Sequence, residues 1–256
     1  EAIMTTDTHP KCVTENLSIN GRPVTICGMA KGAGMIEPNM ATMLCFLATD
    51  AAVAPPALQP CLSEAVARSF NRISVDGEMS TNDTVLLLAN GRAGNRSASL
   101  GSAEHEAFAS LLFPMMTELA AMIVRDGEGA TKAVDIRIRG ARSDRDANVL
   151  AYHLANSPLV KTSFYGRDPN WGRLMAALGS AGPWMHPQKI DIFYDRVCLV
   201  RNGIGQGKKK TDQAGKVLRK DAFTVTIDLH IGAGSAHVLT SDLTHDYVTL
   251  NASYPS

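Results

Sequence analysis

The chain has 256 residues, of which 45% are hydrophobic and 20% charged, an ordinary composition for a globular protein with a buried core. Lysine plus arginine equals aspartate plus glutamate, 25 each, so charge gives no reason to expect nucleic acid or a membrane as partner. The five cysteines contain no C-x-x-C pair and the seven histidines no metal-ligand spacing, so we expect no bound metal and a reducing, cytoplasmic compartment.

The first half of the chain predicts strands and helices in mixed order. The apolar run at 43–48 fits a buried strand, and residues 84–89 fit another. Two prolines open a helix that extends from residue 55 to about residue 70. Ser102 is placed to cap a helix that continues to Arg125, in which Pro114 predicts a kink or a division into two helices.

The second half predicts more strands. Apolar and charged residues alternate at 134–139, as in a half-buried strand. Ser143 or Asp144 caps a helix to about residue 156, and residues 170–178 form another after a proline turn. Further strands are expected at 190–194, 197–201, 223–230 and 236–240, with an exposed hairpin or loop at 203–220. Because strands and helices do not alternate strictly, we expect a layered α+β fold.

Thr42 follows a polar turn and begins an apolar strand. Most threonines in this position are simply β-branched residues at a strand start. Thr42 could instead be a nucleophile, because the α-amine of an N-terminal threonine can accept the proton of its own hydroxyl. Inside a chain its nitrogen is an amide, so the Ala41–Thr42 bond would first have to be cut. The pattern alone does not decide between these interpretations.

Several ordered stretches resemble the ornithine acetyltransferase (glutamate N-acetyltransferase) family over essentially the whole chain. The longest is GMAKGAGMIEPNMATML at 28–44, which resembles the family's self-cleavage region. The others are AIMTTDT at 2–8, DG and STNDT at 76–84, EG and TK at 128–132, KT and GRDPNWGR at 161–173, and TSDLTH with YV and N at 240–251.

The resemblance implies a transferase of arginine biosynthesis that moves an acetyl group from N2-acetyl-L-ornithine to L-glutamate. The reaction would be ping-pong, through an acetyl ester on Thr42, after self-cleavage between Ala41 and Thr42. No cofactor is implied, although some family members also accept acetyl-CoA as a substrate. Family members are cytoplasmic, or mitochondrial in eukaryotes.

The resemblance also implies roles for individual residues. Thr42 matches the nucleophile, and the substrate-binding positions are Thr5, Lys31, Thr42, Glu128, Asn251 and Ser256. Lys31 is suited to a substrate carboxylate and Glu128 to a substrate ammonium. Thr6, beside Thr5, leaves an ambiguity of one residue. The motifs at 80–83 and 168–173 are interpreted as structural, with Trp171 packed and Arg173 paired.

The implied fold is a layered α/β/β/α sandwich of the N-terminal-nucleophile-like type with a smaller C-terminal α/β portion. Residues 1–41 match the end of the family's α chain and 42–256 its β chain, with room for a sub-domain at about 133–256. The family's oxyanion hole comes from a Thr-Gly pair upstream of the motif at 2–8. We therefore expect a missing N-terminal segment as partner, in an α/β heterodimer that assembles to a heterotetramer. Since one oxyanion donor is worth about 10² to 10³ in rate, this polypeptide alone should be nearly inactive.

Two alternatives remain open from the sequence. An N-terminal-nucleophile aminopeptidase or amidase of related fold would use the same threonine but pass the acyl group to water. A non-catalytic binding domain would keep the fold and an intact 41–42 bond.

Overall fold

The computed structural model describes residues 1–37, 43–79 and 82–253. The chain divides into two compact units, a first unit of Glu1–Ile73 with Glu78–Asp126 and a second unit of Ser74–Gly77 with Gly127–Ser256. Each unit is built around its own β-sheet, and each is described by itself below.

The first unit contains a four-stranded sheet in the order β1-β2-β3-β5. Its strands are β1 (Lys11–Ile19), β2 (Arg22–Lys31), β3 (Leu44–Thr49) and β5 (Thr84–Ala89). β1 and β2 pair antiparallel through Asn20 and Gly21, which both have positive φ, as the tightest hairpin turns require. β3 pairs antiparallel with β2 and parallel with β5, which confirms the strands expected at 43–48 and 84–89.

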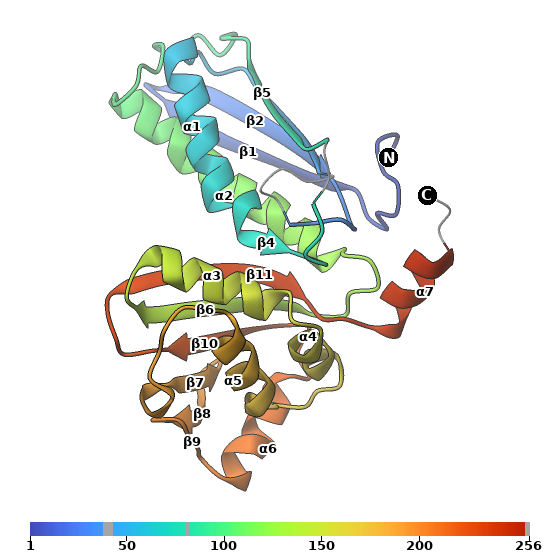
Figure 1. Cartoon of the computed structure of the whole chain (residues 1–256). Helices are drawn as coiled ribbons and strands as arrows, with labels where there is room; N and C mark the ends of the chain where they lie inside the picture. Colours follow the sequence, from blue (N-terminus) through green and yellow to red (C-terminus); the bar gives the residue numbers. More distant parts are fainter. Residues whose placement is uncertain (38–42, 80–81, 254–256) are drawn as a thin grey trace. The chain divides into compact units, whose positions relative to one another are not determined.

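Two long helices accompany this sheet, α1 (Pro55–Arg68) and α2 (Ala103–Arg125). α2 packs against β1 and β2, and α1 packs against α2 (Figure 1). The close approach of α2 to β2 is helped by Gly28 of β2, because a Cβ atom at this position would lie 2.4 Å from the Cε atom of Met115 of α2. Both predicted helices are confirmed.

α2 begins as expected, because the Ser102 side chain accepts a hydrogen bond from the His105 amide. It continues through Pro114 as a single helix, so of the two expected possibilities, a kink or a division into two helices, the division is wrong. Proline removes the donor for the Ser110 carbonyl, but Ser110 is exposed and water can replace that donor. By length and composition α2 could cross a membrane, yet 56% of its most apolar stretch is buried inside the protein, as in a core helix.

The second unit contains a mixed sheet in the order β4-β11-β6-β10-β7-β8-β9. Its central strands, β6 (Ala133–Ala141) and β10 (Ala222–Asp228), are parallel. β11 (Gly234–Ser241) pairs antiparallel with β6, and β7 (Asp191–Tyr194) with β10. The remaining strands are β8 (Val197–Arg201), β9 (Ile204–Gly205) and the two-residue β4 (Ile73–Ser74), of which only Ser74 is counted in the second unit. The strands expected from sequence in this half are confirmed.

Among the described residues, the α-helices of the second unit are α3 (Asp144–Ala155), α4 (Pro158–Tyr165), α5 (Trp171–Ser180), α6 (Lys208–Val217) and α7 (His245–Ser253). The side chains of Ser143, Ser157 and Asn170 accept hydrogen bonds from the first-turn amides of α3, α4 and α5. Trp171 packs against the core, and Arg173 donates to the Leu159 carbonyl at 2.8 Å. The structural interpretation of this motif is therefore confirmed.

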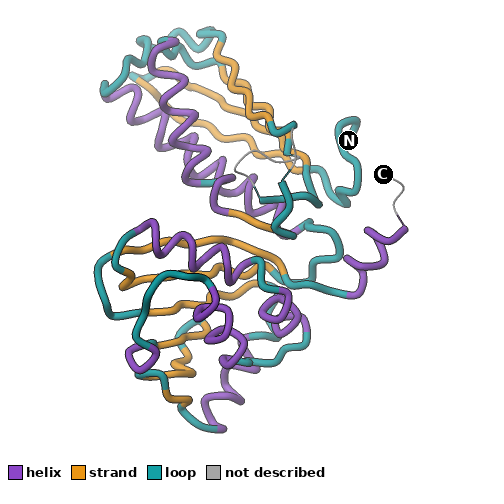
Figure 2. Tube along the Cα trace, viewed as in Figure 1, coloured by secondary structure: helices purple, strands orange, loops and turns teal. Residues whose placement is uncertain are grey.

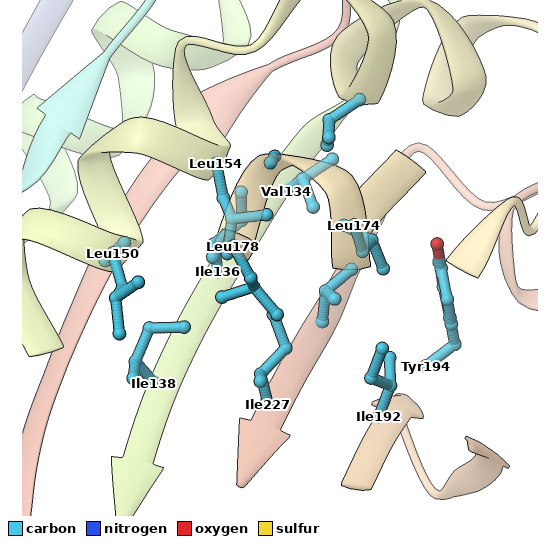
Figure 3. Packing of buried hydrophobic residues seen from close by; sticks show 14 of the residues in the cluster. Val134, Ile136, Ile138, Leu150, Leu154, Leu174, Leu178, Ile192, Tyr194 and Ile227 are labelled. Atoms are coloured by element: carbon cyan, nitrogen blue, oxygen red, sulfur yellow. The ribbon is translucent and has the colours of Figure 1, made fainter. Parts of the chain in front are cut away.

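The core of the second unit lies between its sheet and its helices (Figure 3). Val134, Ile136 and Ile138 point from β6 toward Leu150 and Leu154 of α3 and Leu174 and Leu178 of α5, with Ile227, Ile192 and Tyr194 further along the sheet. All ten side chains are at most 1% exposed. Val134, Ile136 and Ile138 are the apolar residues of the alternating pattern from which β6 was predicted.

The expectation of an exposed hairpin or loop at 203–220 is only partly confirmed: β8 and β9 form a hairpin that reaches Gly205, but residues 208–217 form α6. Ala214, Val217 and Leu218 are buried, and their spacing of three and four residues places them on one helix face. Lys208 to Lys210 form the first turn of this helix, and Lys208 and Lys209 are exposed. The helix was not predicted because this stretch is rich in lysine and glycine and has only three buried apolar residues, Ala214, Val217 and Leu218.

The structure confirms the α+β class, because helices and strands are mixed and each unit is a sheet with helices packed on it (Figure 2).

Candidate functional site

The predicted site positions fall into three groups. Thr5 and Lys31 lie in the first unit, and Glu128 and Asn251 lie in the second. Ala41, Thr42 and Ser256 lie outside the described residues. Each unit therefore holds part of the predicted set.

In the first unit, the Asp7 carboxylate joins the two predicted segments. Asp7 Oδ1 accepts a hydrogen bond from the Gly32 amide at 2.7 Å, next to Lys31, and Asp7 Oδ2 accepts one from the Thr5 amide at 3.2 Å. Thr5 itself is exposed, whereas Lys31 is buried at the end of β2. The sequence motifs at 2–8 and 28–34 thus meet at one carboxylate.

A buried ion cluster holds Asp7 in place. Lys11, only 2% exposed, donates to Asp7 Oδ1 at 2.6 Å and also to Asp126 at the end of α2. Burial alone would raise the pKa of Asp7, but hydrogen bonds from Gly32, Lys11 and Thr5 outweigh it and hold the pKa below its usual value. The pKa of Asp126 is lowered in the same way against its burial, chiefly by Lys11.

Asp83 fixes the residue that follows Thr42 in the chain. Its carboxylate accepts a hydrogen bond from the Met43 amide, and the Thr84 amide donates to the Met43 carbonyl at 3.0 Å. Both polar backbone groups of Met43 are thereby held at the start of β3. Lys31 pairs in the sheet with Leu44, two residues after Thr42.

Burial raises the pKa of Asp83 to about 6, although the Met43 amide and the positive charge of Lys31 act to lower it. Its Oδ2 atom is buried and has no hydrogen-bond partner among the described residues. A carboxyl group that titrates this close to neutrality is typical of functional sites as well as of strained structural ones. The sequence reasoning did not single out Asp83, because its motif at 80–84 looks like an ordinary turn.

Next to Asp83 lies a cavity of about 460 Å³. Met43, Asp83 and Thr84 line it together with side chains of α1, among them Leu62 and Val66. It is a partly apolar hollow with one carboxylate residue in its lining, a size and character suited to a small molecule.

In the second unit, Glu128 and Asn251 are hydrogen-bonded to each other. Glu128 Oε2 accepts from Asn251 Nδ2 at 2.8 Å, across 123 positions of sequence. Asn251 lies on α7, so the stretch that sequence alone would leave as a frayed tail is helical as far as Ser253. The structure thus brings together two of the residues of this unit that are predicted to bind substrate.

The loop that carries Glu128 is fastened to the segment after β11. Asp242 accepts hydrogen bonds from the amides of Thr131 and Lys132 at 2.8 and 2.9 Å, and from the Thr131 hydroxyl. Thr244 donates to the Gly129 carbonyl at 2.7 Å. Gly129 has φ +65°, and a Cβ atom there would lie 2.5 Å from the Tyr247 nitrogen, so only glycine fits.

No group of three or more potential metal ligands exists among the residues that the structure describes. All five cysteines are free, and Cys45 and Cys61 are buried. Burial raises the pKa of the Cys45 thiol to about 12, which makes it unreactive.

The fold and its polar clusters define a class of α+β protein. In it, buried charged side chains hold short loops in place, and these loops carry polar side chains. Such an arrangement is suited to binding small charged molecules. The model of the ArgJ family matches residues 1–256. The chain therefore belongs to the ArgJ family, which confirms the family expected from the sequence motifs.

Relatives of known name agree with this membership. The chain is 52% identical over 253 residues to the arginine biosynthesis bifunctional protein ArgJ of Geobacter sulfurreducens, covering 99% of this chain and 64% of that protein. It is 50% identical to the protein of the same name from Syntrophotalea carbinolica, with the same coverage. The chain thus spans about 64% of the length of these curated relatives.

A solved structure is also similar. The crystal structure of arginine biosynthesis bifunctional protein ArgJ from Bacillus halodurans matches with a TM-score of 0.77 and 37% identity, over 82% of this chain and 98% of that one.

Proposed function

We propose that the complete protein is a glutamate N-acetyltransferase of arginine biosynthesis that takes its acetyl group from N2-acetyl-L-ornithine. The family match over residues 1–256 carries this proposal, and the relatives named above bear names of arginine biosynthesis. The geometry of each unit supports it separately.

In the first unit the support comes from the Asp7 carboxylate. It holds the Thr5 amide and the Gly32 amide together, so the loop beside Lys31 is fixed by buried contacts. An ammonium at Lys31 can bind the α-carboxylate that N-acetylornithine and glutamate share. Fixing a binding group before substrate arrives reduces the entropy lost on binding.

The proposed nucleophile is Thr42, after cleavage of the Ala41–Thr42 bond. The hydroxyl oxygen attacks the acetyl carbon of N-acetylornithine, its proton passes to the Thr42 α-amine, and ornithine leaves with that proton. The α-amine of glutamate then attacks the ester and restores the hydroxyl. The two hydrogen bonds to Met43 support this role, because they hold the chain immediately after the nucleophile.

In the second unit the support is the contact between Glu128 and Asn251. The resemblance assigns both residues, and Ser256, to substrate binding. A carboxylate at Glu128 suits a substrate ammonium, and the Asn251 amide holds that carboxylate in one orientation.

We further propose that a segment with the family's oxyanion-hole Thr-Gly pair completes the protein as part of an α/β heterodimer, which assembles to a heterotetramer. Exposed apolar side chains on the first unit's sheet support this proposal. Met29 of β2 and Leu86 and Leu88 of β5 are 44%, 45% and 68% exposed. Apolar patches of this kind commonly mark an interface. No cofactor is proposed, and acetyl-CoA is a candidate second acetyl donor.

The decisive experiment replaces Thr42 by Ala in the complete protein. We expect intact-mass analysis to show two polypeptides for the unchanged protein and one for the variant, which should have no transfer activity. Thr14→Ala is the matched control, because Thr14 is an exposed threonine on β1 and its loss should change neither result. Cleavage that persists in Thr42→Ala would contradict the assignment.

Kinetics distinguish transfer from hydrolysis. A ping-pong transferase gives parallel initial-rate lines at several glutamate concentrations and an acetylated Thr42 peptide when glutamate is withheld. An aminopeptidase or amidase would instead release acetate at a rate that glutamate does not change. A binding domain would retain the uncut bond.

A further inference from the structure

A buried lysine lies beside the segment that fastens the Glu128 loop. Lys161 of α4 is 3% exposed, and its ammonium donates to Thr240 Oγ1 at 3.0 Å, to Ser241 Oγ at 3.3 Å and to the Ser241 carbonyl. The two hydroxyls donate onward to the carbonyls of Ala155 and Val75, at 3.2 and 3.4 Å. They are therefore free to accept from Lys161, and the ammonium has three acceptors for its three protons.

These contacts fix the end of β11 and the residues that follow it. The Leu243 amide donates to the Lys161 carbonyl at 3.4 Å, so side chain and main chain of Lys161 both hold the segment 240–244. The resemblance motif that begins at Lys161 has no role in the proposed reaction. The burial of the Lys161 side chain therefore requires another explanation, because removing an ammonium from water is costly.

The segment that Lys161 fixes is the one that holds the Glu128 loop. Asp242 accepts from the amides of Thr131 and Lys132, and Thr244 donates to Gly129. The path from Lys161 to the loop therefore passes through two consecutive sets of hydrogen bonds. In the first set Lys161 bonds to Thr240 and Ser241. In the second set Asp242 and Thr244, which follow in the same segment, bond to the loop.

We propose that Lys161 is a positioning residue for Glu128: it fixes residues 240–244, and through Asp242 and Thr244 it holds the loop 127–132 in the conformation that pairs Glu128 with Asn251. The substrate consequence rests on the proposed function, whereas the effect on the loop does not. Burial lowers the pKa of Lys161 to about 7 against the opposing charges of Asp242 and Asp76, so the contact is also sensitive to neutral pH.

The first test is hydrogen exchange in the complete protein carrying Lys161→Met, which keeps the length of the side chain but no donor. The amides of Thr131 and Lys132 should exchange about tenfold faster, as expected for loss of about one charged hydrogen bond. Asp191→Asn is the matched control, because Asp191 is equally buried and bonded to Arg201 and Asn202 elsewhere in the same unit. Unchanged exchange at Thr131 and Lys132 in a folded Lys161→Met protein would overturn the proposal.

A milder variant covers the case in which Lys161→Met does not fold. Ser241→Ala removes one acceptor and leaves the lysine in place, so the same two amides should exchange faster by about threefold. Unchanged amides in this variant would equally count against the proposal.

The second test is kinetic and depends on transferase activity. Lys161→Met should raise KM for both substrates about tenfold and change kcat less than about twofold, because binding rather than chemistry is disturbed. If Lys161 acts through Glu128, it should raise KM little further in a Glu128→Gln background. Additive effects would contradict a path through Glu128. An inactive unchanged protein would contradict the proposed function but leave the exchange result standing.

Discussion

Lys11 in the first unit and Lys161 in the second are both buried lysines, 2% and 3% exposed, yet their partners differ. Lys11 lies between two carboxylates, Asp7 and Asp126. Lys161 bonds only to hydroxyl and carbonyl oxygens in the described structure, and its pKa falls to about 7 because burial dominates.

The comparison shows that two similarly buried lysines can have electrostatically different partners. Around Lys11 the ion pairs compensate for lost hydration, and the pKa values of Asp7 and Asp126 are held low. Around Lys161 the acceptors are dipoles, which compensate less. The Lys11 cluster is therefore suited to holding residues 7–11 permanently against Asp126. The contacts of Lys161 are suited to responding to pH.

The largest effect is expected for Lys11→Met. This change leaves the carboxylates of Asp7 and Asp126 buried without their cation, so the free energy of unfolding at pH 7 should fall by about 3 to 5 kcal/mol. Lys220→Met is the control, because its pair with Asp195 is exposed and should contribute about 0 to 1 kcal/mol. Denaturant unfolding of both proteins measures the difference, and equal losses would show that the cluster is not important for stability.

A smaller effect concerns the pH dependence around Lys161. The folded pKa of about 7 lies below the ordinary 10.5, so the unfolded chain binds more protons between these values. Stability should therefore rise with pH across this window, by at most about 1.4 kcal/mol per pH unit, and be lost as pH falls toward 7.

Lys161→Met should remove that slope. The measurement is the free energy of unfolding of the native protein and of Lys161→Met at several pH values between 7 and 10, and the difference between the two slopes tests the prediction. Parallel curves would mean that the folded pKa of Lys161 is not lowered.

The smallest effect is expected for Asp83→Asn. The raised pKa of about 6 means that Asp83 stabilises the fold in its protonated form, and that this contribution is lost as pH rises from about 4 through 6. Asparagine keeps an acceptor for the Met43 amide without the charge, so the variant should be more stable than the native protein above pH 6. Because Asp83 is only partly buried, the gain should be about 1 kcal/mol.

Thermal unfolding at pH 4.5 and pH 7.5 measures this prediction. The two proteins should differ little at the lower pH and diverge at the higher. A native protein that is the more stable one at pH 7.5 would indicate a favourable partner for the Asp83 carboxylate.

Much of the local structure could be predicted from the sequence. Alternation at 134–139 predicted β6, and Ser102, Ser143 and Asn170 marked the starts of three helices, because periodicity and capping depend on neighbours in the chain. α6 was missed, since its buried face is only Ala214, Val217 and Leu218 within a basic stretch.

The family also followed from the sequence alone, because long ordered motifs such as that at 28–44 are linear patterns. Which side chains meet across long stretches of sequence was decided only by the tertiary structure. Lys11 and Asp126 are 115 positions apart, and Glu128 and Asn251 are 123 apart. Contacts over such separations, and the pKa shifts that depend on burial, come from the packing of whole sheets and helices, which no local pattern contains.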